Sequence, residues 1–388
     1  MEYYVLDDLL RRDFLIQNYI SIIWTERYSA WGDFQIVMPS NSNNRRLFTP
    51  GIRVTRNNSY RVATIETVTD SIAQDGTKTL TIVGRSFEAL LEDRVAMPSL
   101  TATITAPYWV ITGNPANIAR QIFNVVCVTA ALNQLDVMPY YAFGTLIGSG
   151  SIPEPTDIIS VAFTPDTVYN SVKKICDMYA LGFRLVKDGE KGLVYFEVYT
   201  GSDRTSTQTL LPPVIFDPNL ETLEDVTTLT SMANVKTVAY VFAQNGTAVV
   251  YSPTADQTAN GADRRILLVN SNNTTVAGTA LTAALQQEGL VALASYRPVY
   301  QFDGTMPQNL PYVYGVDYVL GDIVEERTEN GLGNQMIVTE QIFSSDNTGE
   351  KSYPTLTLVQ TITPGTWLAW DAGAVWNTVD PSEYWGTI

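Results

Sequence analysis

The sequence predicts an α+β protein that is mainly β, in which β-rich parts flank a region with helices. Two segments carry most of this prediction, Ile23–Asn41 and Tyr312–Val324, because each sets a Gly-Asp pair against a strand with apolar residues at alternate positions. A third observation is a region of helical spacing between about residues 100 and 210. With 388 residues and 45% apolar side chains, the chain is large enough for two or three domains with cores of their own.

The N-terminal part is expected to consist of strands. A half-buried strand follows the turn at Gly32-Asp33, since apolar residues occupy every second position up to Met38. From Tyr60 to Phe87 two more strands run on either side of Asp75-Gly76, a pair that favours a hairpin turn. These strands predict a first domain built from β-structure.

Two amphipathic helices are expected in the middle of the chain. The first begins at Asn114-Pro115, because proline is favoured at the first helical position, and it places Cys127 on its apolar face. The second begins at Thr164–Asp166, carries Cys176 on its apolar face and is expected to stop at Gly182. Both thiols are interpreted as small core residues, with a disulfide between the two helices as the alternative.

Strands accompany these helices, which predicts an inserted α/β domain over residues 100–210. They lie at Phe183–Val186 and Val194–Tyr199 and are joined by a turn at Asp188-Gly189. Between the helices, Gly144–Pro155 is rich in Gly, Ser and Pro and is expected to be an exposed loop.

Strand patterns return after Pro212-Pro213. Asn245-Gly246 predicts a hairpin, and a third helix is expected from about Thr279 to Tyr296. The Gly321-Asp322 pair makes a corner between two strand halves. The last strands are expected at Tyr312–Val324, Met336–Phe343 and Thr355–Gln360.

The formal charge of −16 is unevenly distributed. Residues 1–204 carry 18 basic and 21 acidic side chains and residues 205–388 carry 6 and 19, so −13 of the −16 lies in the second half. Because phosphate binding needs clustered Lys and Arg, sequence-specific recognition of nucleic acid is not expected. Acidic walls would suit a channel through which DNA slides without being held. An alternative of equal weight is that the negative charge only keeps the protein soluble.

The chain has no histidine, which limits the chemistry it can perform. Ser-His-Asp and Cys-His triads and His-ligated zinc are excluded, so no enzyme activity, cofactor or metal is expected. Pairs of carboxylates remain as a route to glycoside hydrolysis, but none has a diagnostic spacing. The acidic cluster around the Gly321-Asp322 corner is interpreted as solvated turn carboxylates rather than as a calcium site. It comprises Asp317, Asp322, Glu325 and Glu326.

Taken together with several shorter motifs, the two Gly-Asp segments resemble a family of minor tail proteins of long-tailed siphophages, regarded as baseplate hub or tail-associated proteins. The resemblance covers about residues 4–358. The motifs that carry it are Ile23–Asn41, Val83–Ser86, Leu90-Leu91, Arg94, Tyr312–Val324 and Met336–Tyr353.

This resemblance implies a hub fold of two β-barrel domains with an inserted α/β domain. The first barrel would comprise residues 1–99 and 211–262, the insertion residues 100–210, and the second barrel, with one helix, residues 263–360. Two similar barrels per chain would let a homotrimer present six of them to a sixfold tail tube. The resemblance further implies tail-tube, distal-ring and other tail-tip proteins as partners, with the tape-measure protein and DNA passing through the channel. The protein would lie in the virion tail tip after assembly in the host cytoplasm, where a reducing environment argues against the disulfide.

Residues 361–388 are expected to be an interaction tail rich in tryptophan. Four indole rings are too many for so short a segment to bury by itself, so we expect it to dock on a neighbouring subunit or another tail-tip protein. Stacking on a host glycan and packing on its own second barrel are the alternatives. The four residues are Trp367, Trp370, Trp376 and Trp385.

The sequence is therefore interpreted as a structural hub of a siphophage tail tip. A protein that binds a cell-wall glycan through the terminal tryptophans is the first alternative, and a carboxylate-dependent cell-wall hydrolase is the second. No apolar run is long enough to span a bilayer, and the charged residues Glu2, Asp7 and Asp8 argue against a signal peptide.

Overall fold

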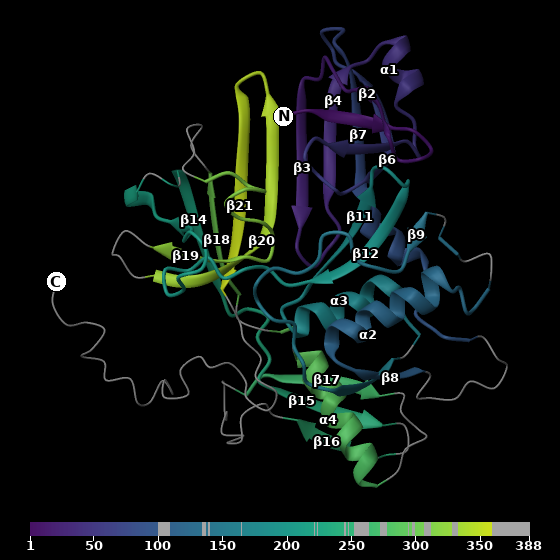
Figure 1. The fold of residues 1–388 in the computed structure, drawn as a ribbon, viewed down its shortest axis with the longest axis vertical. Coiled ribbons are helices and arrows are strands. Elements are labelled where there is room, and N and C mark those ends of the chain that lie inside the picture. Colours follow the sequence, from purple (N-terminus) through teal and green to yellow (C-terminus); the bar gives the residue numbers. More distant parts are fainter. Residues whose placement is uncertain are drawn as a thin grey trace.

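A computed structural model describes most of the chain. The described residues are 1–99, 109–133, 137–138, 140–163, 165–220, 222, 224–243, 246, 248–251, 264–271, 278–293, 295–296, 299–305, 312–327 and 333–358. They form a mainly β protein with few helices, as the sequence predicts. Most strands lie in the upper part of Figure 1, helices α2 and α3 lie below them with β8 beneath α2, and a small sheet with helix α4 lies at the lower end.

One sheet of thirteen strands connects the two ends of the described chain. Its main path runs β14-β18-β21-β20-β3-β4-β7-β6-β5-β1-β2, while β13 and β19 lie off this path and β19 pairs with β20. The N-terminal strands are β1 (Tyr3–Leu6), β2 (Arg12–Leu15), β3 (Ser21–Arg27), β4 (Asp33–Pro39), β5 (Arg53–Arg56), β6 (Ala63–Ile72) and β7 (Lys78–Ser86). The C-terminal strands are β13 (Ile215–Phe216), β14 (Glu224–Ser231), β18 (Val299–Thr305), β19 (Ile323–Arg327), β20 (Gly333–Asp346) and β21 (Gly349–Leu358).

Strand β20 joins the two sets of strands. Its first half pairs with β19, with Ile337 opposite Ile323, and its second half pairs with β3, with Phe343 opposite Trp24. A shift of register relative to β21 falls between Val338 and Glu340, where the strand passes from one set to the other. The purple and yellow strands therefore lie side by side in Figure 1.

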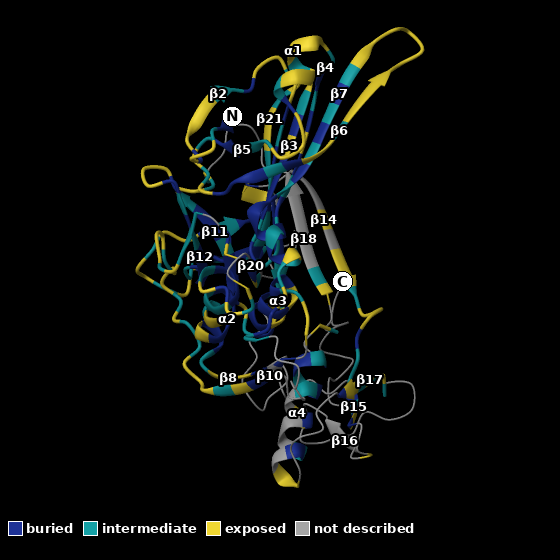
Figure 2. Cartoon of the chain, turned by 90° about the vertical axis from the view of Figure 1, so that its right-hand side faces the viewer, coloured by how far each residue is buried: buried dark blue, intermediate teal, exposed yellow. Residues whose placement is uncertain are grey.

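Alternation of apolar residues explains the N-terminal strands. Strand β4 buries Phe34, Ile36 and Met38 and leaves the intervening residues more accessible, as expected for a half-buried strand. The hairpin of β6 and β7 turns at Asp75-Gly76, where Gly76 has a φ of 83°. Figure 2 shows the outer end of this hairpin projecting beyond the neighbouring strands, with mostly exposed residues.

The helices of the middle part begin close to the predicted positions. Asn114 caps α2 (Pro115–Phe123) by accepting a hydrogen bond from the backbone N–H of Asn117, and a π-helical turn (Asn124–Val128) continues it. Helix α3 (Val168–Met178) is capped by Thr167. Short 3₁₀ helices lie at Phe87–Asp93 and Pro218–Leu220, and helix α1 spans Ser42–Leu47. The other strands of this part are β8 (Trp109–Gly113), β9 (Tyr141–Ala142), β10 (Ile159–Phe163), β11 (Gly182–Asp188) and β12 (Leu193–Tyr199).

The end of α3 differs from the prediction. The helix stops at Met178, and Gly182 already belongs to strand β11. The chain leaves the helix through Ala180, which adopts a φ of 52°. The expected stop at Gly182 was wrong, because this glycine serves a close approach to another strand rather than a helix end.

A small sheet lies apart from the thirteen-stranded sheet, and its helix reaches the core of the middle part through Val291. The small sheet contains β16 (Ala248–Tyr251), β15 (Val238–Ala243) and β17 (Ile266–Ser271), and helix α4 (Thr279–Leu293) packs on one of its faces. The predicted hairpin at Asn245-Gly246 is confirmed by the antiparallel pairing of β15 with β16. The predicted third helix is confirmed as α4, although it ends at Leu293 rather than at Tyr296.

The strand pairing bears on the expected barrels. Strands β13 and β14 lie within residues 211–262, which we assigned to the first barrel, yet they pair with β19 and β18 of the C-terminal set. The main path of the thirteen-stranded sheet is open, and β8 with β10 and β11 with β12 and β9 form two further small sheets, so the described residues contain no closed barrel. The two-barrel architecture and the domain boundaries thus stay predictions. No helix within the described ranges has the length and apolar character needed to cross a bilayer.

Candidate functional site

The three parts of the fold meet around one buried side chain, Tyr28, which follows strand β3. Its hydroxyl group lies within hydrogen-bond distance of the carbonyl oxygens of Ala180 and Tyr199, at 3.0 and 3.1 Å, both in the middle part. Its backbone N–H donates to Thr339 in β20, and its own carbonyl accepts from Phe183 in β11. We call the region around Tyr28 the joint, because a single residue there contacts the N-terminal strands, the middle part and the C-terminal strands.

Glycine residues allow this close packing. A Cβ atom on either Gly182 or Gly321 would lie 2.3 Å from the Tyr28 ring. Gly201 packs directly on the backbone of Gly321, where an added Cβ would lie 2.0 Å from its carbonyl carbon. Gly321 also has a φ of 91°, a conformation that favours glycine. The predicted structural turn at Gly321-Asp322 is thus a contact surface at the joint. The strand expected before it was wrong: residues 312–320 form turns, with Gly315 at a φ of 86° and Asp317 accepting from the N–H of Val313, and strand structure begins only at Ile323 in β19.

The other predicted turn, Gly32-Asp33, lies on the N-terminal side of this region. Gly32 sits against the backbone of Thr25, where a Cβ would be 2.1 Å from the carbonyl oxygen. Asp33 forms an ion pair with Arg27, which also pairs with Glu340 in β20. Since Arg27 is less than one third exposed, this three-residue cluster ties β3 and β4 to the C-terminal strands.

Two buried ion pairs reinforce the joint. Arg61 and Glu88 are 5% and 0% exposed and approach to 3.0 Å, and Glu88 also accepts from the backbone N–H of Leu185 in β11. Arg56 pairs with Glu26 and stacks on the ring of Phe343 in β20, 3.8 Å from its centroid. Burial alone would raise the pKa of Glu26, but Arg56 and Arg61 outweigh it and hold that pKa below its usual value.

The acidic corner is more buried than the sequence indicated. Asp322 and Glu326 are fully buried and Glu325 is 8% exposed, so the interpretation of these three as solvated carboxylates was wrong. Asp322 accepts hydrogen bonds from the backbone N–H groups of Ser202 and Val319. Burial raises the pKa of both Asp322 and Glu326. The corner is therefore an internal support of the joint.

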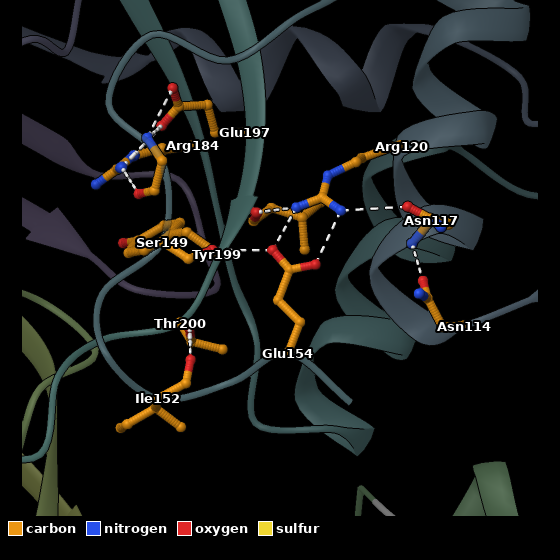
Figure 3. A network of polar contacts seen from close by, with 12 residues as sticks. Asn114, Asn117, Arg120, Ser149, Ile152, Glu154, Arg184, Glu197, Tyr199 and Thr200 are labelled. Atoms are coloured by element: carbon orange, nitrogen blue, oxygen red, sulfur yellow. Dashed lines mark hydrogen bonds and ion pairs between the residues drawn. The ribbon is translucent and has the colours of Figure 1, made fainter. Parts of the chain in front are cut away.

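A second polar network holds the loop at residues 144–155 (Figure 3). Glu197 in β12 accepts hydrogen bonds from the backbone N–H groups of Leu146 and Ile147. It also pairs with Arg184, as Figure 3 shows. Arg120 of helix α2 makes a two-pronged contact with Glu154 and donates to the carbonyl of Val198. The predicted loop is confirmed, but two buried or half-buried carboxylates fix it to the body of the protein.

The two cysteines and the polar networks of the joint make internal contacts in the described structure. Cys127 and Cys176 are buried free thiols, as predicted for core residues, and burial raises the pKa of Cys127 to about 12. No group of three metal-ligating side chains is found in the part of the chain that the structure describes. In the described polar networks at the joint, carboxylates form ion pairs with guanidinium groups or accept hydrogen bonds from backbone N–H groups. Such contacts hold the parts of the fold together.

Sequence reasoning located both Gly-Asp turns but missed the buried ion pairs. Arg61 and Glu88 stand in a loop and a short 3₁₀ helix, so no periodic pattern marked them as internal. The four terminal tryptophans, Trp367, Trp370, Trp376 and Trp385, lie outside the described residues.

Comparisons with known proteins agree with this fold. A tail protein from Neisseria meningitidis MC58 superposes with a TM-score of 0.55 at 14% identity, covering 94% of this chain and 97% of that chain. The 43 kDa tail protein of prophage MuSo2 from Shewanella oneidensis gives a TM-score of 0.50 at 15% identity, covering 92% and 98%. No curated protein matches in sequence.

The fold is thus shared with phage tail proteins over nearly the whole length of both chains. The sequence also matches the profile of the Siphovirus ReqiPepy6 Gp37-like proteins over residues 2–354, which includes both Gly-Asp turns, the buried ion pairs of the joint and all but the end of β21. The chain belongs to this family of siphovirus tail proteins.

Proposed function

We propose that the protein is the structural hub of a siphophage tail tip, that three copies form a closed ring, and that this ring connects the tail tube to the tip. The ring would enclose the channel for DNA and the tape-measure protein, with tail-tube and distal-ring proteins above and other tail-tip proteins below. It acts by assembly rather than by chemistry. The observation that carries this proposal is the family match over residues 2–354.

The geometry of the joint supports a role as a ring subunit. A ring closes only if each copy holds its parts at a fixed angle, because a small error per subunit accumulates around the circle. The β3–β20 pairing and the stacking of Arg56 on Phe343 connect the two sets of strands. The hydrogen bond from the Leu185 N–H to Glu88 connects the N-terminal part to the middle part. A subunit braced in this way would resist bending under the load of an attached tail.

Electron cryomicroscopy of the purified full-length protein and of tail tips tests the proposal. We expect a threefold ring with a central opening, and native mass spectrometry should give the mass of three 42.8 kDa chains. A protein that is monomeric at micromolar concentration and that occupies the tail tip without threefold symmetry would refute it.

The strongly acidic C-terminal half allows a second test of the channel. If the acidic residues line the opening, density for the ring should show them facing inward and DNA should not be retained on the isolated ring. Acidic side chains spread evenly over the outer surface would instead assign the charge to solubility.

The glycan-binding alternative rests on the tryptophans of residues 361–388. A pull-down with host cell-wall polysaccharide, comparing the full chain with a form lacking residues 361–388, distinguishes the two functions. The hub proposal predicts equal, low retention of both forms. Retention that depends on the terminal segment would favour a receptor-binding role, and release of sugar from purified cell wall would favour a hydrolase.

A further inference from the structure

The small sheet presents an apolar outer face. Its inner face is covered by helix α4, which packs on Ala239, Val241 and Ala243 of β15 and on Leu267 and Val269 of β17. Because side chains of a strand alternate between faces, the residues between these point away from the helix. Phe242, Ile266 and Leu268 are accordingly 43%, 43% and 62% exposed. This outer face lies at the lower end of the molecule (Figure 2).

The strand register gathers these side chains into one patch. In the parallel pairing of β15 with β17, Tyr240 stands opposite Leu268, and Val238, which is buried and bounds the patch, stands opposite Ile266. Phe242 is opposite Asn270, which is also exposed. Two adjacent strands thus offer three accessible apolar side chains and one tyrosine, more than the isolated exposed apolar residue that is ordinary on a protein surface.

Positive charge surrounds this patch in an otherwise acidic half of the chain. Residues 205–388 contain six basic side chains, and three of them, Lys236, Arg264 and Arg265, flank the small sheet. Arg264 donates to the hydroxyl of Tyr240 and lies over its ring, which places this guanidinium group on the outer face. Arg265 is exposed and donates to the carbonyl of Met232. Within the described residues neither Lys236 nor Arg265 forms an ion pair.

The chain itself contains a segment of matching chemistry. Residues 359–388 carry four tryptophans, three acidic residues and no Lys or Arg. The described chain ends at Leu358 in β21, and a further 30 residues can span up to about 100 Å when extended. Each indole ring offers about 150–250 Å² of surface for burial. Aromatic rings and carboxylates in one segment complement apolar residues and guanidinium groups in one patch.

We propose that the C-terminal segment 359–388 docks on the outer face of the small sheet, with its tryptophans on Phe242, Ile266 and Leu268 and its carboxylates near Arg264 and Arg265. This inference goes beyond the hub function, because it holds whether the segment comes from the same chain or from a neighbouring copy.

Chemical cross-linking of the full-length protein tests the contact. Cysteine is introduced at Asn270 on the outer face and at Ala369 or Ala374 between the tryptophans, and a short bis-maleimide is added. Native Cys127 and Cys176 are buried and should stay unreacted. The matched control pairs the same segment cysteines with Ser71→Cys, a strand residue on the β6–β7 hairpin that is also exposed.

We expect cross-linking through Asn270→Cys to be several-fold above the control. A product of single-chain mass shows docking within the chain, and a product of two-chain mass shows docking on a neighbour, and both support the proposal. Yields equal to those of the Ser71→Cys control for both segment positions would overturn it, whatever the oligomeric state of the protein.

Tryptophan fluorescence gives an independent measurement. Leu268→Glu places a negative charge in the patch, and Ile72→Glu places one at a site of similar exposure, 68%, away from it. Docking predicts a red-shifted emission and greater quenching by acrylamide for Leu268→Glu, and a spectrum like the wild type for Ile72→Glu. Identical spectra for the two variants would contradict the proposal.

Discussion

The buried pair Arg61–Glu88 is expected to dominate the stability of the joint. Replacing Arg61 by Met leaves the Glu88 carboxylate fully buried with only the N–H of Leu185 as a partner, and one of its oxygens already lacks a partner among the described residues. Removing one member of a buried ion pair typically costs about 3–5 kcal/mol. The carbonyl of Arg27 also loses a hydrogen bond from Arg61. We therefore expect Arg61→Met to lower the free energy of unfolding by about 4 kcal/mol.

A double-mutant cycle separates the charge from the packing. Glu88→Gln removes the charge but keeps an acceptor for Leu185, so the double variant Arg61→Met/Glu88→Gln should recover about 2 kcal/mol relative to Arg61→Met alone. The matched control is Arg45→Met. Arg45 pairs with Asp70 at 47% and 38% exposure, so this variant should lose far less stability than Arg61→Met.

Equilibrium unfolding in urea measures these differences from the midpoint and the slope of each transition. The reasoning fails if Arg61→Met and Arg45→Met destabilise equally, or if the double variant is less stable than Arg61→Met. Hydrogen exchange at Leu185 gives a local readout, because this amide loses protection if the pair fastens β11 to the joint.

Further outcomes follow from the joint and the thiols. Gly321→Ala should lower the Tm more than Gly76→Ala: both glycines have positive φ, which costs a side chain about 1–2 kcal/mol, but only a Cβ at Gly321 would meet an aromatic ring. Equal Tm losses would contradict this. Cys127 and Cys176 should react with a thiol reagent in urea but not in the native protein, since burial raises both pKa values. Rapid reaction of either thiol in the native protein would show that the core around that cysteine is accessible to the reagent. The pKa of Glu26 is lowered by nearby guanidinium groups despite its burial, so its stabilising contribution is present above its unfolded pKa of 4.5 and is lost as the pH falls through the lower folded value. As the pH falls from about 5 to about 3, the free energy of unfolding of the Glu26→Gln variant should therefore decrease less than that of the wild type. Parallel plots of the free energy of unfolding against pH for the two proteins would refute the lowered pKa of Glu26.

Local patterns predicted many of the described strands and helices because the responsible forces are local, but they wrongly predicted a strand over residues 312–320, which form turns. Alternation marked β4, the Asn114-Pro115 pair marked the start of α2, and Asn245-Gly246 marked a hairpin. The end of α3 was misplaced because Gly182 resembles a helix stop, while its absent side chain is required by Tyr28 from a distant strand.

The joint could be predicted only in part. Both Gly-Asp turns were identified, but their neighbours come from elsewhere in the chain: Asp33 reaches β20 through Arg27, and Gly321 packs on Gly201. Asp322 was assigned to solvent because its segment lacks the pattern of a calcium-binding loop, whereas the middle part covers it here and Ser202 donates to it. Contacts between distant segments leave no periodic signal in a single sequence.

The pairing of β3 with β20 sets the order in which the protein can fold during its synthesis. Trp24 in β3 stands opposite Phe343, so the edge of the N-terminal strands stays unpaired while more than three hundred further residues are translated. At about 5–20 residues per second, this interval lasts roughly 15–60 s. An exposed strand edge invites pairing with other nascent chains. Chains released early from the ribosome would therefore lack a complete sheet and would be prone to aggregation.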